Sequence, residues 1–186
     1  MSLKDTIESY VPLDEQEEKD KEQMLMFIDN FDDVLTRNNV IGHFSASAFV
    51  VNKERTKMAS VYHIISDGWT YPGGHADGEE DLLKVALREC EEETGLKAKV
   101  LSDKPILISS NYVKSHIKRG KLVSSHLHFD FLYLMEADEN IELTYREDES
   151  KGVKWISFDD IENENMVDFV KPIVLKLSKK VKSMKL

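Results

Sequence analysis

The sequence predicts an α/β or α+β domain in which strands lie on both sides of one central helix and further helices flank them. Two patterns support this class. Apolar residues recur at helical spacing over residues 17–37, whereas runs such as 43–51 and 124–136 have the length and apolar content of strands. The chain of 186 residues contains no linker rich in Pro, Gly or Ser and no internal repeat, so we expect one substantial core.

The first predicted element is a helix over Glu17 to about Arg37, and Asn38-Asn39 mark its end. Its apolar stripe consists of Met24, Phe27, Ile28, Phe31, Val34 and Leu35. This segment is too short to bury a core of its own. We therefore expect residues 1–40 to form a helical extension packed on a domain of residues 41–186, or a dimer contact, rather than a separate domain.

The strands are predicted over residues 43–51, 58–65, 97–101, 105–113, 124–136 and 152–157. A basic segment between two of them contains Lys114, His116, Lys118, Arg119 and Lys121. It predicts either a loop that closes over phosphates, with Arg119 binding substrate, or a hairpin turn centred on Gly120 with solvated charges. Further on, Ser157 is placed to cap a helix that begins at Phe158, and Pro172 lies in the first turn of the terminal helix or kinks it.

The most informative segment is an acidic run on the central helix. Glu89, Glu92 and Glu93 are spaced i, i+3 and i+4, so a helix places their carboxylates on one face. Thr94-Gly95 is a natural helix stop, so the three anions gather where the helix dipole is already negative. This arrangement does not favour stability, and a hard divalent cation with oxygen ligands would relieve the repulsion.

The same helix has an apolar side and follows a glycine-rich loop. Its core stripe consists of Leu83, Ala86, Leu87 and Cys90. Upstream, the loop Trp69-Thr-Tyr-Pro-Gly-Gly-His-Ala-Asp-Gly leaves backbone N–H groups free to approach an anion. We therefore predict a unit of strand, loop and helix, with metal ligands at the far end of the helix.

Residues 74–96 resemble the Nudix box, Gly-x5-Glu-x7-Arg-Glu-U-x-Glu-Glu-x-Gly-U, in which U is aliphatic. The matching residues are Gly74, Glu80, Arg88, Glu89, Glu92, Glu93, Gly95 and Leu96. Cys90 is the one departure, and it is mild because a buried thiol behaves as a small hydrophobe. The resemblance implies an α/β/α sandwich around a mixed β-sheet, here with an added N-terminal helix.

The resemblance also implies hydrolysis of a diphosphate bond in a small nucleoside diphosphate-linked or nucleotide substrate, with Mg²⁺ or Mn²⁺ as the cofactor. Glu89, Glu92 and Glu93 would hold the metal, and Gly74 would let the loop backbone approach it. Two alternatives remain. A non-catalytic ligand-sensing Nudix domain usually has a damaged box, whereas this box is intact. A Nudix-type prenyl diphosphate isomerase needs a catalytic cysteine in a loop, whereas Cys90 is predicted in the helix core.

Candidate catalytic residues extend beyond the metal ligands. By resemblance, Arg88 orients a carboxylate through a bidentate ion pair and Glu80 braces the loop and helix, although ordinary surface ion pairing also explains both. Glu92 and Arg88 are the catalytic candidates within the box. Glu149 is a third, because it precedes Trp155 in a loop where related enzymes place an extra acid near the metals. A merely solvated acidic loop explains Glu149 equally well.

A second candidate site lies in the longest predicted strand. Strand alternation places His126, His128 and Asp130 on one face, each about 7 Å from the next. The row is either a polar outer face or, because Leu132 and Leu134 continue it, a row whose beginning opens to a cleft. We expect a substrate pocket, with both histidines donating hydrogen bonds to substrate oxygens and Asp130 orienting a histidine or basic side chain. A zinc site is not expected, since no third close ligand is evident.

The charge and composition bound the partners. A net charge of −10 argues against nucleic acid polymers, because binding a polyanion needs clustered Lys and Arg. A small phosphate-containing substrate differs, since divalent cations invert the local field. One cysteine excludes an intramolecular disulfide, and no apolar run suggests a membrane span or a signal peptide. We expect a cytoplasmic protein without a membrane partner, and homodimer formation is left open.

Overall fold

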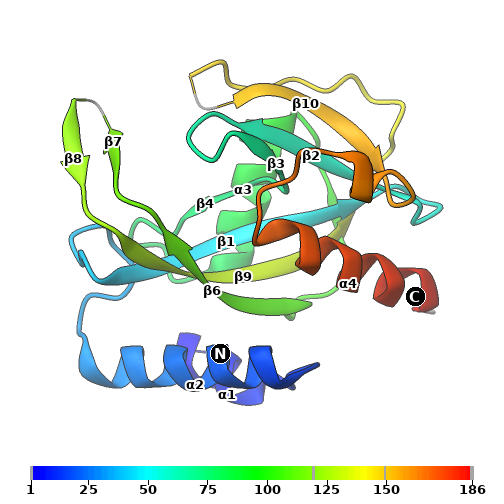
Figure 1. Ribbon diagram of the computed structural model, residues 1–186. Coiled ribbons are helices and arrows are strands. Elements are labelled where there is room, and N and C mark those ends of the chain that lie inside the picture. Colours follow the sequence, from blue (N-terminus) through cyan, green and yellow to red (C-terminus); the bar gives the residue numbers. More distant parts are fainter. Residues whose placement is uncertain (1, 119, 149, 185–186) are drawn as a thin grey trace.

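The computed structural model describes residues 2–118, 120–148 and 150–184. A mixed β-sheet has the strand order β10-β2-β1-β9-β5, with β3 beside β2, β4 beside β1 and β6 beside β9 (Figure 1). Its strands are β1 (Gly42–Val51), β2 (Lys57–His63), β3 (Gly68–Thr70), β4 (Gly73–His75), β5 (Lys99–Val100), β6 (Leu107–Val113), β9 (His126–Glu136) and β10 (Ser150–Ser157). The remaining elements are α1 (Leu3–Ser9), α2 (Glu15–Asn30), α3 (Leu82–Thr94), β7 (His116–Lys118), β8 (Lys121–Val123), the 3₁₀ helix η1 (Ile161–Asn163) and α4 (Val170–Ser183). β1 and β9 run parallel and the other pairs antiparallel, so the sheet is mixed as predicted.

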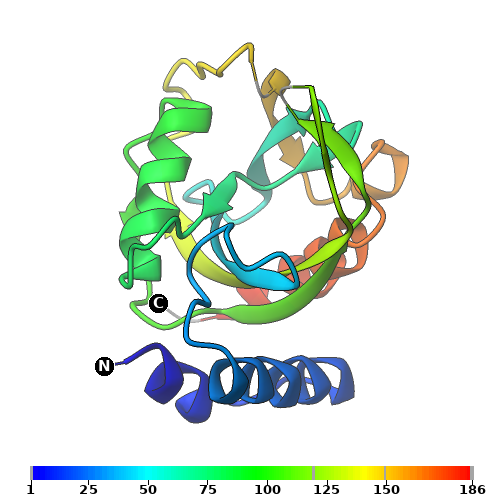
Figure 2. The same cartoon turned by 90° about the vertical axis from the view of Figure 1, so that its left-hand side faces the viewer.

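Alternating strand residues build an apolar core on each face of the sheet. On one face, Phe44 of β1 and Phe129 of β9 belong to a core shared with α3 and the N-terminal helices. On the other face, Phe49 of β1 and Leu132 of β9 pack with Val174 of α4. Because successive strand residues point to opposite faces, α3 and α4 lie on opposite sides of the sheet (Figure 2). The predicted α/β/α sandwich is confirmed.

The N-terminal helices complete the first of these cores. α1 and α2 lie beneath β6 and β9 in Figure 1, with Ile7, Met24 and Phe27 buried. The Phe27 ring lies 4.6 Å from the Phe129 ring. The division of the chain at residue 40 stays a prediction, but the extension shares its core with the sheet.

Two predicted helix boundaries are wrong. The helix predicted over residues 17–37 ends at Asn30, and Phe31 is already extended with φ −132°. Asp32-Asp33 follow, and acidic residues are unfavourable at the negative end of a helix dipole. In place of the helix predicted from Phe158, the structure has the short η1, and α4 begins only at Val170. Pro172 lies in the first turn of α4, which is one of the two positions predicted for it. The intervening segment instead extends along β3, where Met166 forms a parallel bridge with Trp69.

The basic segment forms the hairpin that the sequence favoured. Lys118 of β7 pairs with Lys121 of β8, and Gly120 has φ +76°, which favours glycine. Arg119 lies outside the described residues, so its proposed contact with substrate stays a prediction. No helix in the described ranges has both the length and the apolar character needed to cross a membrane.

A buried ion pair joins α2 to α4. The Glu17 carboxylate is 1% exposed and accepts hydrogen bonds from the Tyr10 hydroxyl at 2.5 Å and the Leu13 N–H at 2.8 Å. It also pairs with the Lys176 ammonium group. The N-terminal extension is therefore tied to the terminal helix by charge as well as by apolar packing.

We expect Lys176→Met to lower the free energy of unfolding by about 3 kcal/mol, because it leaves a buried carboxylate without its cation. Lys179 is an exposed lysine of the same helix, and Lys179→Met should change stability by less than about 0.5 kcal/mol. Urea unfolding of the two variants measures the difference. Equal stability would show that the ion pair contributes nothing.

Candidate active site

Helix α3 places the acidic cluster at its C-terminal end. Asp81 caps the helix by accepting a hydrogen bond from the Lys84 N–H at 3.1 Å, and Gly95 ends it at φ +74°. The predicted helix stop is correct. The predicted core stripe is displaced, since the fully buried apolar residues are Leu82, Val85, Ala86 and Cys90, with Leu83 and Leu87 only half-buried at its edge. This helical stripe continues to Glu93, which brings one carboxylate into the interior.

The three carboxylates differ in burial. Glu93 is 4% exposed and accepts a hydrogen bond from the Gly73 N–H at 2.8 Å. The side chain of Glu89 is 13% exposed, and that of Glu92 is 43% exposed. The cluster therefore extends from the protein interior to the solvent.

Strand β4 passes close to the cluster because it carries two glycines. Gly74 pairs with Ala46 of β1, whose side chain lies in the core shared with α3. A Cβ at Gly74 would lie 2.3 Å from Cδ of Glu89, so no larger residue fits without displacing that carboxylate. The segment that the sequence predicted as a loop thus contains β3 and β4. It brings backbone to the carboxylates as expected, whereas a role of Gly74 in holding metal stays a prediction.

Two arginines contact the carboxylates. Arg88 places Nη2 2.7 Å from Oε1 of Glu89 and Nε 3.9 Å from Oε1 of Glu92. The bidentate pair expected for Arg88 is therefore wrong, because its contacts are divided between two glutamates. Arg146, in the segment between β9 and β10, places Nη1 3.3 Å from Oε2 of Glu92. Sequence reasoning missed Arg146, since it lies far along the chain and belongs to no local pattern.

The outlying acids differ from expectation. Glu80 is exposed and forms no ion pair with the residues described. Glu79 instead accepts a hydrogen bond from the Asp81 N–H at 3.2 Å and pairs with Lys84 at 2.5 Å, so the bracing contacts predicted for Glu80 belong to its neighbour. Glu149 lies outside the described residues.

The polar row on β9 is covered. His126 is 8% exposed, Asp130 is 3% exposed and His128 is half-buried. A solvent-facing outer surface is therefore the wrong interpretation of the row. Across from these residues, β1 and β6 contribute His43, Ser45, Ser109 and Asn111. The row becomes apolar at Leu132, where the core beneath α4 begins.

Asp130 has different partners from those predicted. It accepts hydrogen bonds from the hydroxyls of Ser45 at 2.8 Å and Ser47 at 3.0 Å, rather than from a histidine or a basic side chain. Burial raises the pKa of Asp130 to about 6, and the two hydroxyls oppose that rise only in part. Its role in substrate binding stays a prediction.

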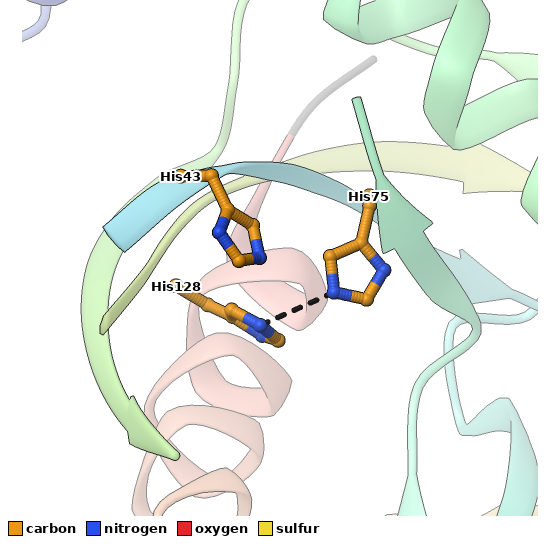
Figure 3. Close-up of side chains that lie close together, drawn as sticks. All are labelled: His43, His75 and His128. Carbon is orange, nitrogen blue, oxygen red and sulfur yellow. Dashed lines mark hydrogen bonds between the residues drawn. The ribbon is translucent and has the colours of Figure 1, made fainter. Parts of the chain in front are cut away.

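Histidines from three strands meet beside this row. His43 of β1 and His75 of β4 point toward His128 of β9 (Figure 3). The expectation that no third close ligand accompanies His126 and His128 is therefore wrong. Burial lowers the pKa of His75 and that of His128 to about 2, so both rings are neutral at neutral pH. Strand pairing brings these residues together, and no spacing along the chain could have indicated it.

The fold and the acidic site together define a class: an α/β/α sandwich whose central helix presents three glutamates to a glycine-bearing strand. A family model described as the NUDIX domain matches residues 43–177. The chain therefore belongs to the NUDIX domain family, as its box indicated.

Three similar proteins show the range of this family. The chain is 34% identical over 95 residues to a probable DHNTP pyrophosphohydrolase of Lactococcus lactis, covering 51% of this chain and 54% of that protein. It is 30% identical over 118 residues to an RNA pyrophosphohydrolase of Pelagibacter ubique, covering 61% and 74%. The chain thus matches about half the length of the first relative. A NUDIX-family hydrolase structure from Clostridium perfringens has a TM-score of 0.57 and 23% identity over 75% of this chain and 97% of that one, which shows the fold.

Proposed function

We propose that the chain is a divalent-metal-dependent hydrolase that cleaves a diphosphate bond in a small nucleoside diphosphate-linked or nucleotide substrate. The observation that carries the proposal is the gathering of Glu89, Glu92 and Glu93 at the end of α3, where Glu93 accepts a hydrogen bond from the Gly73 N–H and Glu89 lies against Gly74. Three like charges at the negative end of a helix repel one another, and a divalent cation with oxygen ligands would relieve that repulsion. The family supports the same activity, because the two relatives described above are named pyrophosphohydrolases.

The donors fit a hard cation. All three side chains offer carboxylate oxygens, which Mg²⁺ and Mn²⁺ prefer over nitrogen or sulfur. When bound, such a cation neutralises the diphosphate, polarises a P–O bond and activates water. The protein contributes the positioning: the Gly73 N–H fixes Glu93, Arg88 fixes Glu89, and Glu92 stands at the solvent side where substrate arrives. Glu92 is the proposed catalytic ligand, Arg88 is the proposed positioning residue, and Glu149 is proposed as an additional acid.

We propose that the group linked to the nucleoside diphosphate lies toward the polar row of β9. His126, His128 and Asp130 border a face that is polar yet shielded from water, and such groups fix ligand orientation. Arg119 is proposed to contact phosphate from the β7–β8 hairpin. A small nucleotide suits the charge of −10 better than a long RNA. A cytoplasmic location is proposed on the sequence alone.

The position of the cysteine argues against the isomerase alternative. Cys90 is fully buried in α3, and burial raises the pKa of its thiol to about 11. A reactive cysteine is a partly exposed thiolate. Catalytic turnover would distinguish an enzyme from the ligand-sensing alternative, because a sensor binds its ligand without cleaving it.

We expect the purified protein to release phosphate-containing products from at least one member of a panel that includes nucleoside triphosphates and ADP-ribose. Hydrolysis should require Mg²⁺ or Mn²⁺, disappear in excess EDTA and return when the cation is restored, because the carboxylates alone cannot neutralise a diphosphate. ³¹P NMR identifies the broken bond. Hydrolysis that persists in EDTA would contradict the metal dependence, and metal-loaded protein that binds but never cleaves these compounds would favour the sensor.

A further inference from the structure

Four of the six histidines lie together at one end of the sheet. His43 comes from β1, His75 from β4, and His126 and His128 from β9. The ring centroid of His128 lies 4.9 Å from that of His43, 4.8 Å from that of His75 and 4.9 Å from that of His126. Figure 3 shows the His43, His75 and His128 rings converging on one point.

The nitrogen spacing is close to that of a metal site. One ligand nitrogen each from His43, His75 and His128 lies within 4.8 Å of the others, and Nε2 of His75 is 3.2 Å from Nε2 of His128. In a tetrahedral zinc site with Zn–N bonds of about 2.0 Å, neighbouring nitrogens are about 3.3 Å apart. The His75–His128 spacing already matches this value, and the remaining separations, within 4.8 Å, would have to shorten on coordination.

Outer hydrogen bonds orient the rings of His43 and His126. Nδ1 of His43 lies 3.4 Å from the carbonyl oxygen of Asn39, and Nδ1 of His126 lies 2.8 Å from that of Ser124. A carbonyl can only accept, so each Nδ1 carries a hydrogen, and the neutral ring in this tautomer has its lone pair on Nε2. Metal-binding histidines are held in this way, with the second nitrogen donating to a backbone carbonyl.

Hydrogen bonds satisfy the inward nitrogens only in part. Nε2 of His43 is buried, in a residue that is 4% exposed, and has no hydrogen-bond partner among the described residues. Nε2 of His128 lies 3.2 Å from that of His75 and 3.1 Å from that of His126, although a single N–H can serve only one of them well. The cluster thus contains more inward-facing acceptor nitrogens than N–H groups that could donate to them.

We propose that His43, His75 and His128 bind Zn²⁺ or a similar borderline divalent cation, with His126 adjacent to the site. Imidazole nitrogens select such cations, whereas Mg²⁺ prefers the oxygens of the glutamate cluster. The two sites are distinct because neighbouring strand residues point to opposite faces: Gly74 faces α3 and Glu89, and His75 faces the side of Ser45. The bound cation ties β1, β4 and β9 together, and so stabilises the folded state.

Calorimetric titration with Zn²⁺ in excess Mg²⁺ tests the proposal, because Mg²⁺ saturates the oxygen ligands. The wild-type protein should bind one equivalent and unfold at a higher temperature when loaded. His43→Ala, His75→Ala and His128→Ala should each weaken binding at least tenfold, since each removes one ligand. His63→Ala on β2 is the matched control and should bind as the wild type does.

A second measurement covers the case in which a variant does not fold. Long-range ¹H–¹⁵N spectra of the wild-type protein should show the Nε2 signals of His43, His75 and His128 shifting on addition of one equivalent of Zn²⁺. Unshifted signals, no binding in excess Mg²⁺, or equal affinity in wild type and all three ligand variants would each overturn the proposal.

Discussion

Glu93→Gln is expected to lower kcat by several orders of magnitude while the protein remains folded, and Glu92→Gln should have a similar effect. Both changes remove a charge from the proposed metal site, and a neutral amide is a poor ligand for a hard cation. The fold should persist in Glu93→Gln because the amide group keeps an oxygen that accepts the hydrogen bond from the Gly73 N–H. Removing one anion also reduces repulsion at the end of α3. Steady-state kinetics and thermal unfolding of each variant measure the two quantities.

The matched control is Glu91→Gln. Glu91 lies in the same helical turn, but its side chain is 56% exposed and pairs with Lys97 at 3.6 Å, away from the cluster. Its turnover should equal that of the wild type. Wild-type turnover in both Glu92→Gln and Glu93→Gln would show that these glutamates take no part in hydrolysis.

The two glycines of β4 should respond in different ways to the same substitution. A Cβ at Gly74 would meet the carboxylate of Glu89, which can swing aside, so Gly74→Ala should retain the fold but displace a proposed metal ligand. Misplacement of a catalytic group by about 1 Å can cost about a hundredfold, which is the loss of kcat that we expect. A Cβ at Gly73 would lie 2.2 Å from Oγ and 2.9 Å from Cα of Ser47, on a central strand that cannot move freely. Gly73→Ala should therefore destabilise the protein by about 3 kcal/mol.

Each alanine variant serves as the control for the other. Thermal unfolding should separate them, with Gly74→Ala close to the wild type and Gly73→Ala unfolding at a much lower temperature. Kinetics below the unfolding transition then reports on the site alone. Full activity in Gly74→Ala would mean that the close approach of β4 to Glu89 has no catalytic role.

The features predictable from sequence were local ones. The spacing of Glu89, Glu92 and Glu93 and the glycine stop after them depend only on helix geometry, so both could be read from the chain. The alternation in β9 likewise predicted which of its residues share a face. The family resemblance then supplied the layers of the fold, which periodicity alone left open between two classes.

The features that could not be predicted depend on contacts between distant segments. Arg146 meets Glu92, and His43 and His75 meet His128, only because the sheet and its connections bring them together. Strand register decides such meetings, and a single sequence does not reveal it. The end of α2 at Asn30 is a different case, since its apolar spacing continued while the backbone became extended.

Manganese titration followed by electron paramagnetic resonance, with turnover measured in the same samples, tests the central claim most directly. The claim is that glutamates at the end of α3 hold the cation that hydrolysis requires. In the wild-type protein, turnover should rise in proportion to bound Mn²⁺, and Glu93→Gln should bind Mn²⁺ at least tenfold more weakly, because one charged ligand is gone. Equal Mn²⁺ affinity in the two proteins, or turnover independent of bound Mn²⁺, would contradict the claim.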